Sequence, residues 1–507
     1  MREETEQAII VQPTAPVSTQ HEPQRGKNRF MRYFFTENAS PDSLSIMDLQ
    51  RRACWIGLAL ILQALNEIVA LVPLYLPPVP LLTPWISLIS FCLITGSLIA
   101  LWMALRPTPL QPERSATAQK RPRRWQRIII ILLLITSLAG AAEIAASTVM
   151  GFFMTPIYRN DGTSIDMNAA ILLTEGHNPY TDSNILSVAR RFSILPIWTT
   201  PLREGQFANS ASYPTPDQIN SVFAHDLKTG HAPEFESKVS YPAFSFLSLL
   251  PFVWLGTNNA LPLYLICYVL IVLIGWKVVR PEMRPWLLLL SLANASMLTS
   301  VLNGNADMLS ILLILLAWLL RERRWWSALC LGLALATKQP AWLFLPFYAI
   351  MIWRHYNLKE AILRVSVSAL LMLAINLPFI LWNPHAWLAG VLAPVVDPMF
   401  PMGVGLVALN LTPVLPLLPA LVYTTLEALA MLFCIAWYWR ICKSRPEAAL
   451  LLAVLPLFFA WRSLPSYFYC AALPLFILQV ASDAYEGHSY ISNNSSPAPP
   501  NGVFGKG

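Results

Sequence analysis

Charged residues are scarce in this sequence of 507 amino acids. Only 12% of the residues are charged, whereas 55% are hydrophobic. Soluble globular domains carry charge on roughly 25% of their residues, so a soluble enzyme is excluded. Many apolar runs approach the roughly 20 residues that cross a bilayer as a helix. The composition therefore predicts an all-α, polytopic integral membrane protein.

Several other familiar signals are missing. The first apolar run begins only near Trp55, after a polar and charged segment, so we expect no cleaved signal peptide. None of the seven cysteines falls in the long polar stretch after residue 151, which argues against a disulfide framework. The sequence has no metal-ligand spacing, Walker loop or dinucleotide fingerprint. We therefore expect no metal, no cofactor and no nucleotide-sugar donor.

Apolar runs and loop basicity together predict about twelve transmembrane helices. Basic clusters recur before the first run, in 106–127 and beside several later runs, and these loops should be cytoplasmic. The net charge of +7 thus reflects orientation, and we expect no nucleic-acid partner. The predicted spans are 55–76, 85–105, 128–150, 260–279, 286–302, 306–320, 326–337, 341–353, 364–382, 417–439, 448–461 and 465–480.

This topology predicts four parts, with both termini in the cytoplasm. A largely disordered segment, 1–52, precedes two leading helices and a basic loop in 53–127. A transmembrane module follows in 128–480, with a long first external loop at 151–257, and 481–507 is a disordered tail. Within the loop, the apolar run 241–256 is expected to lie along the outer leaflet, with a thirteenth crossing as the alternative.

Two carboxylates, Asp161 and Asp166, lie where the third apolar run meets water. Apolar residues recur at helical spacing from Ile165 onward, with Ser164 available as an N-cap and "GHNPY" as the stop. This pattern predicts a short amphipathic interfacial helix. The two carboxylates are either solvated groups favoured by the helix dipole or parts of a site.

The same stretch begins a series of segments that resembles the GT-C membrane glycosyltransferases, in particular glycosyltransferase family 87 and its uncharacterised relatives. The resemblance covers roughly 130–480 and leaves out the two leading helices and both tails. It is carried, in this order, by "GHNPY", "YPAFSFLSLLP", "LNGNADMLSILLILLAWLLRERRWW", "GLALATKQPAWLFLPF", "NLPFILWNPHAW" and "FAWRSLPSYFY".

The resemblance implies a GT-C-like fold and the transfer of a hexose, with mannose expected, from a polyprenyl-phosphate sugar donor. The acceptor would be an extracytoplasmic lipid, glycan or protein, and the site would face outward from the plasma (inner) membrane. It also implies an external-loop Asp as general base. A polyprenyl donor keeps its phosphate at the interface, so the base belongs there too. Asp161 is the first candidate, and Asp166 is an alternative base or an acceptor-binding carboxylate.

Lys338 is the leading candidate for a donor-phosphate ligand. The two predicted helices around it have about 12 residues each and reach roughly 18 Å, short of a core of roughly 30 Å. The "TKQP" tip would then lie below the outer surface, where a lysine needs an anion. That anion is either the lipid phosphate or a structural carboxylate such as Asp307; a third possibility is a lysine that snorkels to the interface.

The remaining candidates lie on the same predicted side. Arg462 and His385 would bind the donor phosphate, although Arg462 also suits an interfacial anchor and a lone loop histidine a structural role. Four residues are expected to bind substrate: Asn303, Asn305, Tyr180 and Tyr241. For the two asparagines, a tight Asn-Gly turn is the alternative. Glu67 and Glu143 lie within predicted spans and are expected to pack against polar partners.

Two other classes compete with the enzyme. A transporter or lipid flippase would also use intramembrane charges, but it predicts two similar halves, and the sequence shows no such repeat. A non-catalytic scaffold for envelope assembly is the third interpretation. The acidic residues at the start of the external loop favour the enzyme.

Overall fold

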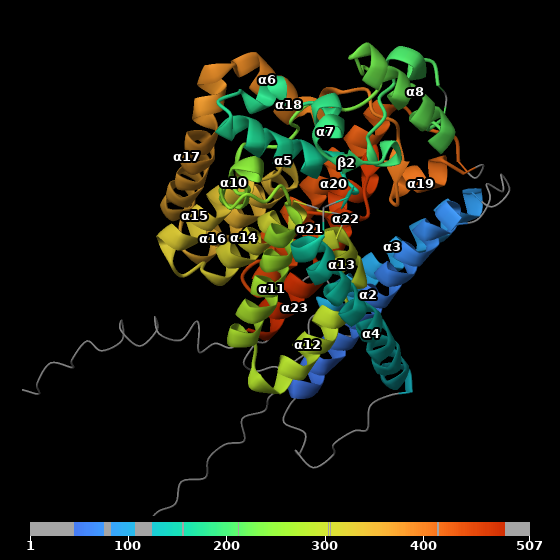
Figure 1. The fold of residues 1–507 in the computed structure, drawn as a ribbon. Coiled ribbons are helices and arrows are strands. Elements are labelled where there is room, and N and C mark those ends of the chain that lie inside the picture. Colours follow the sequence, from blue (N-terminus) through green and yellow to red (C-terminus); the bar gives the residue numbers. More distant parts are fainter. Residues whose placement is uncertain are drawn as a thin grey trace, which may run out of the picture. The chain divides into compact units, whose positions relative to one another are not determined.

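The structure is a computed structural model that describes residues 45–75, 83–106, 124–154, 157–210, 212–302, 304, 306–412 and 415–481. The chain divides into two units, 1–36 and 37–507, and all described residues belong to the second. Helices make up most of this unit, and its strands are only two residues long. The predicted all-α class is confirmed (Figure 1). The predicted tails and the basic loop 107–123 lie outside the described residues.

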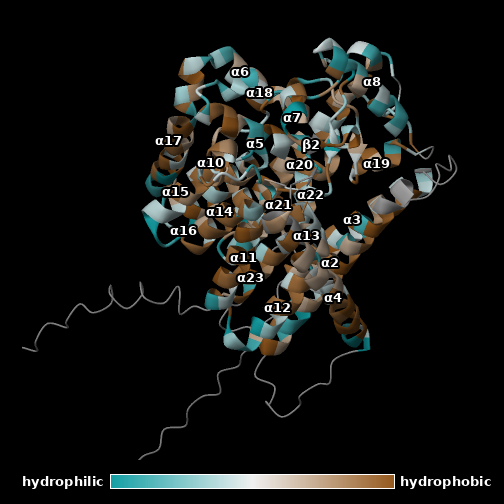
Figure 2. Cartoon of the chain, in the orientation of Figure 1, coloured by the Kyte–Doolittle hydropathy of each residue, from teal (hydrophilic) through white to brown (hydrophobic). Residues whose placement is uncertain are grey.

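Six helices of the described chain are long and apolar enough to cross a membrane. A seventh span results if η4 (Pro281–Met283) and α12 (Arg284–Ala293) are joined to α13 (Ala295–Leu302) across a 51° bend at Asn294. Apolar residues cover most of these helices, as expected for surfaces that meet lipid (Figure 2). The six are α2 (Ile46–Tyr75), α3 (Thr83–Ala104), α4 (Arg124–Phe153), α11 (Leu261–Val278), α17 (Leu358–Trp382) and α20 (Ala420–Ile441).

The structure does not confirm twelve crossings. The other predicted spans contain helices of at most 13 residues, too short for a bilayer core of roughly 30 Å at about 1.5 Å per residue. Pro456 and Pro474 lie within two of these runs, where hydropathy alone does not reveal the breaks. The short elements are α14 (Asp307–Leu319), α15 (Arg324–Leu335), η5 (Gln339–Phe344), α16 (Leu345–His355), η6 (Pro446–Ala448), α21 (Ala449–Leu452), η7 (Leu455–Phe459), α22 (Ser466–Tyr469) and α23 (Ala472–Val480).

The leading helices pack closely on the rest of the unit. Helix α2 contacts α3, α4, α12 and α23, and α4 contacts α12 and α13. At the α4–α12 contact, a Cβ added to Gly140 would lie 1.7 Å from the Leu292 carbonyl oxygen. Only glycine permits this approach of the two backbones.

The external loop forms a chain of short elements. Strand β1 (Ile157–Tyr158) pairs in parallel with β2 (Ser193–Ile194), which closes the loop's first part around α5 (Asp161–Thr174). Helix α5 contacts α6, α7 and α9, and α6 lies beside α18 (Figure 1). The remaining elements are α6 (Pro179–Asp182), α7 (Ile185–Arg191), η2 (Pro196–Trp198), η3 (Gly205–Phe207), α8 (Pro216–Thr229), α9 (Phe244–Leu247) and α10 (Leu250–Trp254).

The prediction for α5 was wrong in two respects. Asn160, rather than Ser164, is the N-cap, because its side chain accepts a hydrogen bond from the Thr163 N–H. Every residue from 163 to 171 is buried, so α5 is an internal helix instead of an amphipathic surface helix. The stop is as predicted: Gly176, at φ +84°, lies directly after the helix.

The run predicted to lie on the outer leaflet is short and has an exposed end. The apolar helical stretch Phe244–Trp254 has too few residues to cross a bilayer core of roughly 30 Å. Trp254 and Leu255, at its end, are 72% and 81% exposed. Length and exposure favour the interfacial position over a thirteenth crossing.

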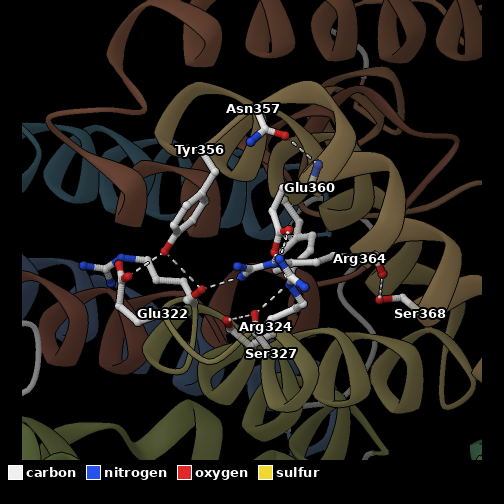
Figure 3. A network of polar contacts seen from close by, with 11 residues as sticks. Glu322, Arg324, Ser327, Tyr356, Asn357, Glu360, Arg364 and Ser368 are labelled. Atoms are coloured by element: carbon white, nitrogen blue, oxygen red, sulfur yellow. Dashed lines mark hydrogen bonds and ion pairs between the residues drawn. The ribbon is translucent and has the colours of Figure 1, made fainter. Parts of the chain in front are cut away.

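Charged side chains join the α14–α15 turn to the start of α17 (Figure 3). The Glu360 carboxylate accepts hydrogen bonds from Arg324 at 2.8 Å and from Arg364 at 2.7 Å. Tyr356 donates to Glu322 at 2.6 Å in the same network. From the sequence, this basic cluster was interpreted only as a signal for membrane orientation. In the structure, Arg324 and Arg364 also hold α15 and α17 together through Glu360. Because α15 starts at Arg324 and ends near Lys338, it carries the chain away from this network to the candidate site.

Candidate functional site

The first carboxylate of the site, Asp161, opens helix α5. One carboxylate oxygen accepts a hydrogen bond from the Gly162 N–H at 2.8 Å. Burial raises the pKa of Asp161, whereas Thr200, Gly162 and the charge of Arg462 act in the opposite direction. The group is thus a poorly hydrated carboxyl within electrostatic reach of a guanidinium.

The second carboxylate, Asp166, lies inside the protein and is fully buried. Its Oδ1 accepts a hydrogen bond from Ser245 Oγ at 3.0 Å, while Oδ2 has no hydrogen-bond partner among the described residues. Burial raises the pKa of Asp166 to about 8, although Ser245 and the charge of Lys338 lower it. The bond to Ser245 ties α5 to α9.

Lys338 lies next to this second carboxylate, and its charge is already matched. Its Nζ is 2.8 Å from Oδ1 of Asp307, and both side chains are buried. The ammonium also lies 4.9 Å from the centre of the Tyr241 ring. Burial lowers the pKa of Lys338, but Asp307 and Tyr241 raise it and the net shift is upward. The lysine therefore stays charged. It lies beside Tyr241, a residue of the external loop.

Arg462 is the other cation of the site, and it has different neighbours. Strand β4 (Arg462–Ser463) pairs in parallel with β3 (Met402–Gly403), which fixes the arginine backbone. Its Nη1 lies 2.6 Å from the Met399 sulfur and its Nη2 3.4 Å from the Met402 sulfur. Thioether sulfur is a weak acceptor. No carboxylate of the described chain lies within ion-pair distance of Arg462, and the carboxylate within its electrostatic reach is Asp161.

Two tyrosines complete the charged group. Tyr467, on α22, lies within electrostatic reach of both Lys338 and Arg462. Tyr213 is within reach of Arg462 and Asp161, and burial raises its pKa to about 12. Neither residue was selected from the sequence, although Tyr467 stands in the "FAWRSLPSYFY" segment. Tyrosines are common near membrane surfaces, so no local signal separated these two from anchors.

A cavity adjoins the group on the side of Asp307 and Tyr467. Besides these two polar residues, most of its wall is apolar and comes from three elements: Ile311 and Ile314 of α14, Phe344 of η5, and Leu457 of η7. Its volume is about 20 Å³, enough for about one water molecule, so it marks a small gap beside the carboxylate and the phenol.

Most of the other predicted site residues are peripheral or undescribed. Tyr180 is buried, donates a hydrogen bond to the Tyr241 carbonyl at 2.8 Å and lies within electrostatic reach of Asp166. His385 is exposed near the start of α18 (Pro384–Val396), and its phosphate role stays a prediction. Asn303 and Asn305 lie outside the described residues. Gly304, between them, accepts a hydrogen bond from Thr163 on α5, which places this turn against the start of α5.

The arrangement of two carboxylates and two cations suits an enzyme that binds an anionic substrate. Comparison with known proteins agrees with this class: residues 240–465 match the model of glycosyltransferase family 87. The match supports a relationship between this part of the chain and family 87, and the family indicates a glycosyltransferase in an integral membrane protein. No curated protein and no solved structure matches the chain.

Proposed function

We propose that the protein transfers a hexose, with mannose as the expected sugar, from a polyprenyl-phosphate sugar to an extracytoplasmic lipid, glycan or protein acceptor. Asp161 is the general base of this reaction, and Arg462 is the main ligand of the donor phosphate. The site faces outward from the plasma membrane. The family match supports the glycosyltransferase class, and the donor, acceptor and residue roles are inferred from the site.

The observation that carries the proposal is the pairing of Asp161 with Arg462. The half-buried carboxyl of Asp161 and the half-buried guanidinium of Arg462, which has only thioether acceptors among the described residues, lie within electrostatic reach of each other. A guanidinium that makes no ion pair at contact distance with a described carboxylate keeps its donors available for a phosphate. A phosphate at Arg462 would bring the adjoining sugar carbon near Asp161, where the acceptor hydroxyl must also bind.

The reaction proceeds with a simple exchange of bonds. The acceptor hydroxyl gives its proton to the Asp161 carboxylate while its oxygen bonds to the anomeric carbon of the sugar. The bond between that carbon and the phosphate oxygen breaks, and its electron pair leaves with the polyprenyl phosphate. Arg462 stabilises the negative charge that develops on this leaving group.

Asp166 and Lys338 are inferred to have supporting roles. Asp166 is fully buried and bonded to Ser245, so it is better placed to orient Tyr241 and its segment than to reach an acceptor. Lys338 can contact the phosphate only by sharing its charge with Asp307.

A transfer assay tests the function directly. The purified protein is incubated with radiolabelled polyprenyl-phosphate mannose and cell-envelope lipids, and GDP-mannose replaces the lipid donor in a parallel reaction. We expect labelled product from the lipid donor only, and roughly 10²–10⁴-fold less of it per unit time from Asp161→Asn. Movement of labelled lipid between leaflets without transfer would establish a flippase instead, and the absence of both activities with every lipid-linked sugar would overturn the enzyme.

A further inference from the structure

We infer that the leading helix α2 supports the site. Its residues Asn66 and Gln63 position the segment that carries Arg462 and Tyr467. The change in KM that this inference predicts rests on the proposed function. Both residues lie outside 240–465, the part of the chain that matches the family.

The side chains of Asn66 and Gln63 are buried in the middle of an apolar helix. Asn66 Nδ2 donates a hydrogen bond to the Tyr469 hydroxyl at 2.8 Å. Gln63 Nε2 donates to Ser97 on α3 at 2.9 Å and to the Phe468 carbonyl at 3.4 Å. Glu67, one residue after Asn66, also hydrogen-bonds the Tyr469 hydroxyl. Polar groups in an apolar environment are expensive unless paired, so these bonds fix α2 against α22.

Helix α22 is only four residues long, and its side chains contact two different parts of the protein. Successive residues of a helix are turned by about 100°, so Tyr467 and Tyr469 point to nearly opposite sides. Tyr469 and Phe468 are buried, and α2 binds both of them. Tyr467 points to the charged group, where it is within reach of Lys338 and Arg462.

So short a helix does not hold its own orientation. One hydrogen-bonded turn is marginal without tertiary contacts, so its orientation depends on the contacts around it. The contacts with α2 are polar and directional, whereas apolar contacts alone would leave α22 free to rotate slightly. Loss of the Asn66 bond should therefore shift Tyr467 and, through the adjoining strand β4, Arg462. Asn66 and Gln63 are accordingly positioning residues and not catalytic ones.

The first test is kinetic and uses Asn66→Leu with a control on the same helix. Ile68 is 61% exposed, so Ile68→Ala changes α2 without touching α22. One buried hydrogen bond is worth about 1 kcal/mol, which corresponds to a change of roughly fivefold. We expect Asn66→Leu to raise the KM for polyprenyl-phosphate mannose about fivefold and Ile68→Ala to leave it unchanged. Equal KM values in the two variants would overturn the inference.

A double-mutant cycle separates positioning from simple stabilisation. If Asn66 acts through α22, its effect on KM should shrink when Tyr467→Phe has already removed the hydroxyl at the site. Melting temperatures of all variants are measured alongside. Effects on KM that add fully, or a fall in melting temperature without a change in KM, would show a merely structural role.

A third measurement does not depend on catalysis. Ser466 lines the cavity next to Tyr467, so the rate at which a maleimide labels Ser466→Cys reports the orientation of α22. We expect Asn66→Leu, but not Ile68→Ala, to change this rate. An unchanged rate would overturn the inference even in an active enzyme. A wild-type protein inactive with every lipid donor would overturn the proposed function alone.

Discussion

The Lys338 ammonium and the Asp307 carboxylate form a buried ion pair at 2.8 Å. Breaking such a pair leaves an unpaired buried charge and costs on the order of 3–5 kcal/mol, whereas replacing both partners with apolar residues is often neutral. We expect Lys338→Met to lower the melting temperature in detergent clearly, and the double variant Lys338→Met/Asp307→Leu to recover most of the loss.

Donor binding by the same variants decides the role of Lys338. If its charge serves mainly Asp307, the double variant should bind polyprenyl phosphate nearly as well as the wild type, and Arg462→Ala should bind it at least tenfold more weakly. If the double variant alone loses binding, Lys338 is the main phosphate ligand and the ranking of the two cations is reversed.

Replacing Asp161 by asparagine keeps the size of the side chain and removes its capacity to accept a proton. Turnover should fall by roughly 10²–10⁴, while the affinity for donor lipid stays the same. Asp166→Asn should reduce turnover less. The matched control is Asp182→Asn, a carboxylate of the same loop with 42% exposure of its side chain. Transfer rates at saturating donor rank the three variants, and an active Asp161→Asn would disprove its role as the base.

The raised pKa of Asp166 predicts a pH-dependent stability. Burial places its folded pKa at about 8, well above the usual value of 3.8. Between these values the folded state binds more protons than the unfolded state, so stability is highest below about pH 4 and decreases until about pH 8. One group contributes a slope of at most about 1.4 kcal/mol per pH unit.

Thermal unfolding at pH 5 and pH 8 measures this contribution. We expect Asp166→Asn to lose less stability than the wild type between the two values, because the amide does not ionise. The same pH dependence in Asp182→Asn and the wild type would assign the effect to Asp166. An Asp166→Asn variant with the full wild-type pH dependence would contradict the shift.

The topology makes a separate prediction that cysteine labelling tests. Cys92 is exposed, so the experiment uses a Cys92→Ser background. A membrane-impermeant maleimide should label Asp217→Cys, on the exposed face of α8, in intact cells. It should label Arg323→Cys, in the α14–α15 turn, only after permeabilisation. Labelling of both positions from outside would place them on the same side of the membrane and contradict the predicted arrangement.

The membrane class and the relation to family 87 could be predicted from composition and from the order of the motifs, because these two signals are spread over many residues. The membrane class, the relation to family 87 and the position of Lys338 near the external loop were all predicted in this way. The number of spans was not, because hydropathy does not distinguish one long helix from short helices broken at proline.

The sequence pattern also did not predict which individual side chains are buried. Asp166 was expected at a membrane surface but is fully buried, since α6, α7 and α9 pack around α5. The Asp307 partner of Lys338 was one of three alternatives that spacing left open. Contacts between distant segments, such as Arg462 with Met399 and Met402, depend on a parallel strand pair only two residues long.

The contact of α2 with α22 shows that residues beside the candidate site lie outside the part of the chain that matches family 87. Residues 240–465 contain Lys338 and Arg462 but exclude Asp161, Tyr467 and Asn66. The recognisable part of the chain therefore holds the cations, while the proton acceptor precedes it and the tyrosine follows it. If Asp161 is the proton acceptor and Arg462 the phosphate ligand, a protein that shares only this part would keep the proposed phosphate site and lack the proposed base.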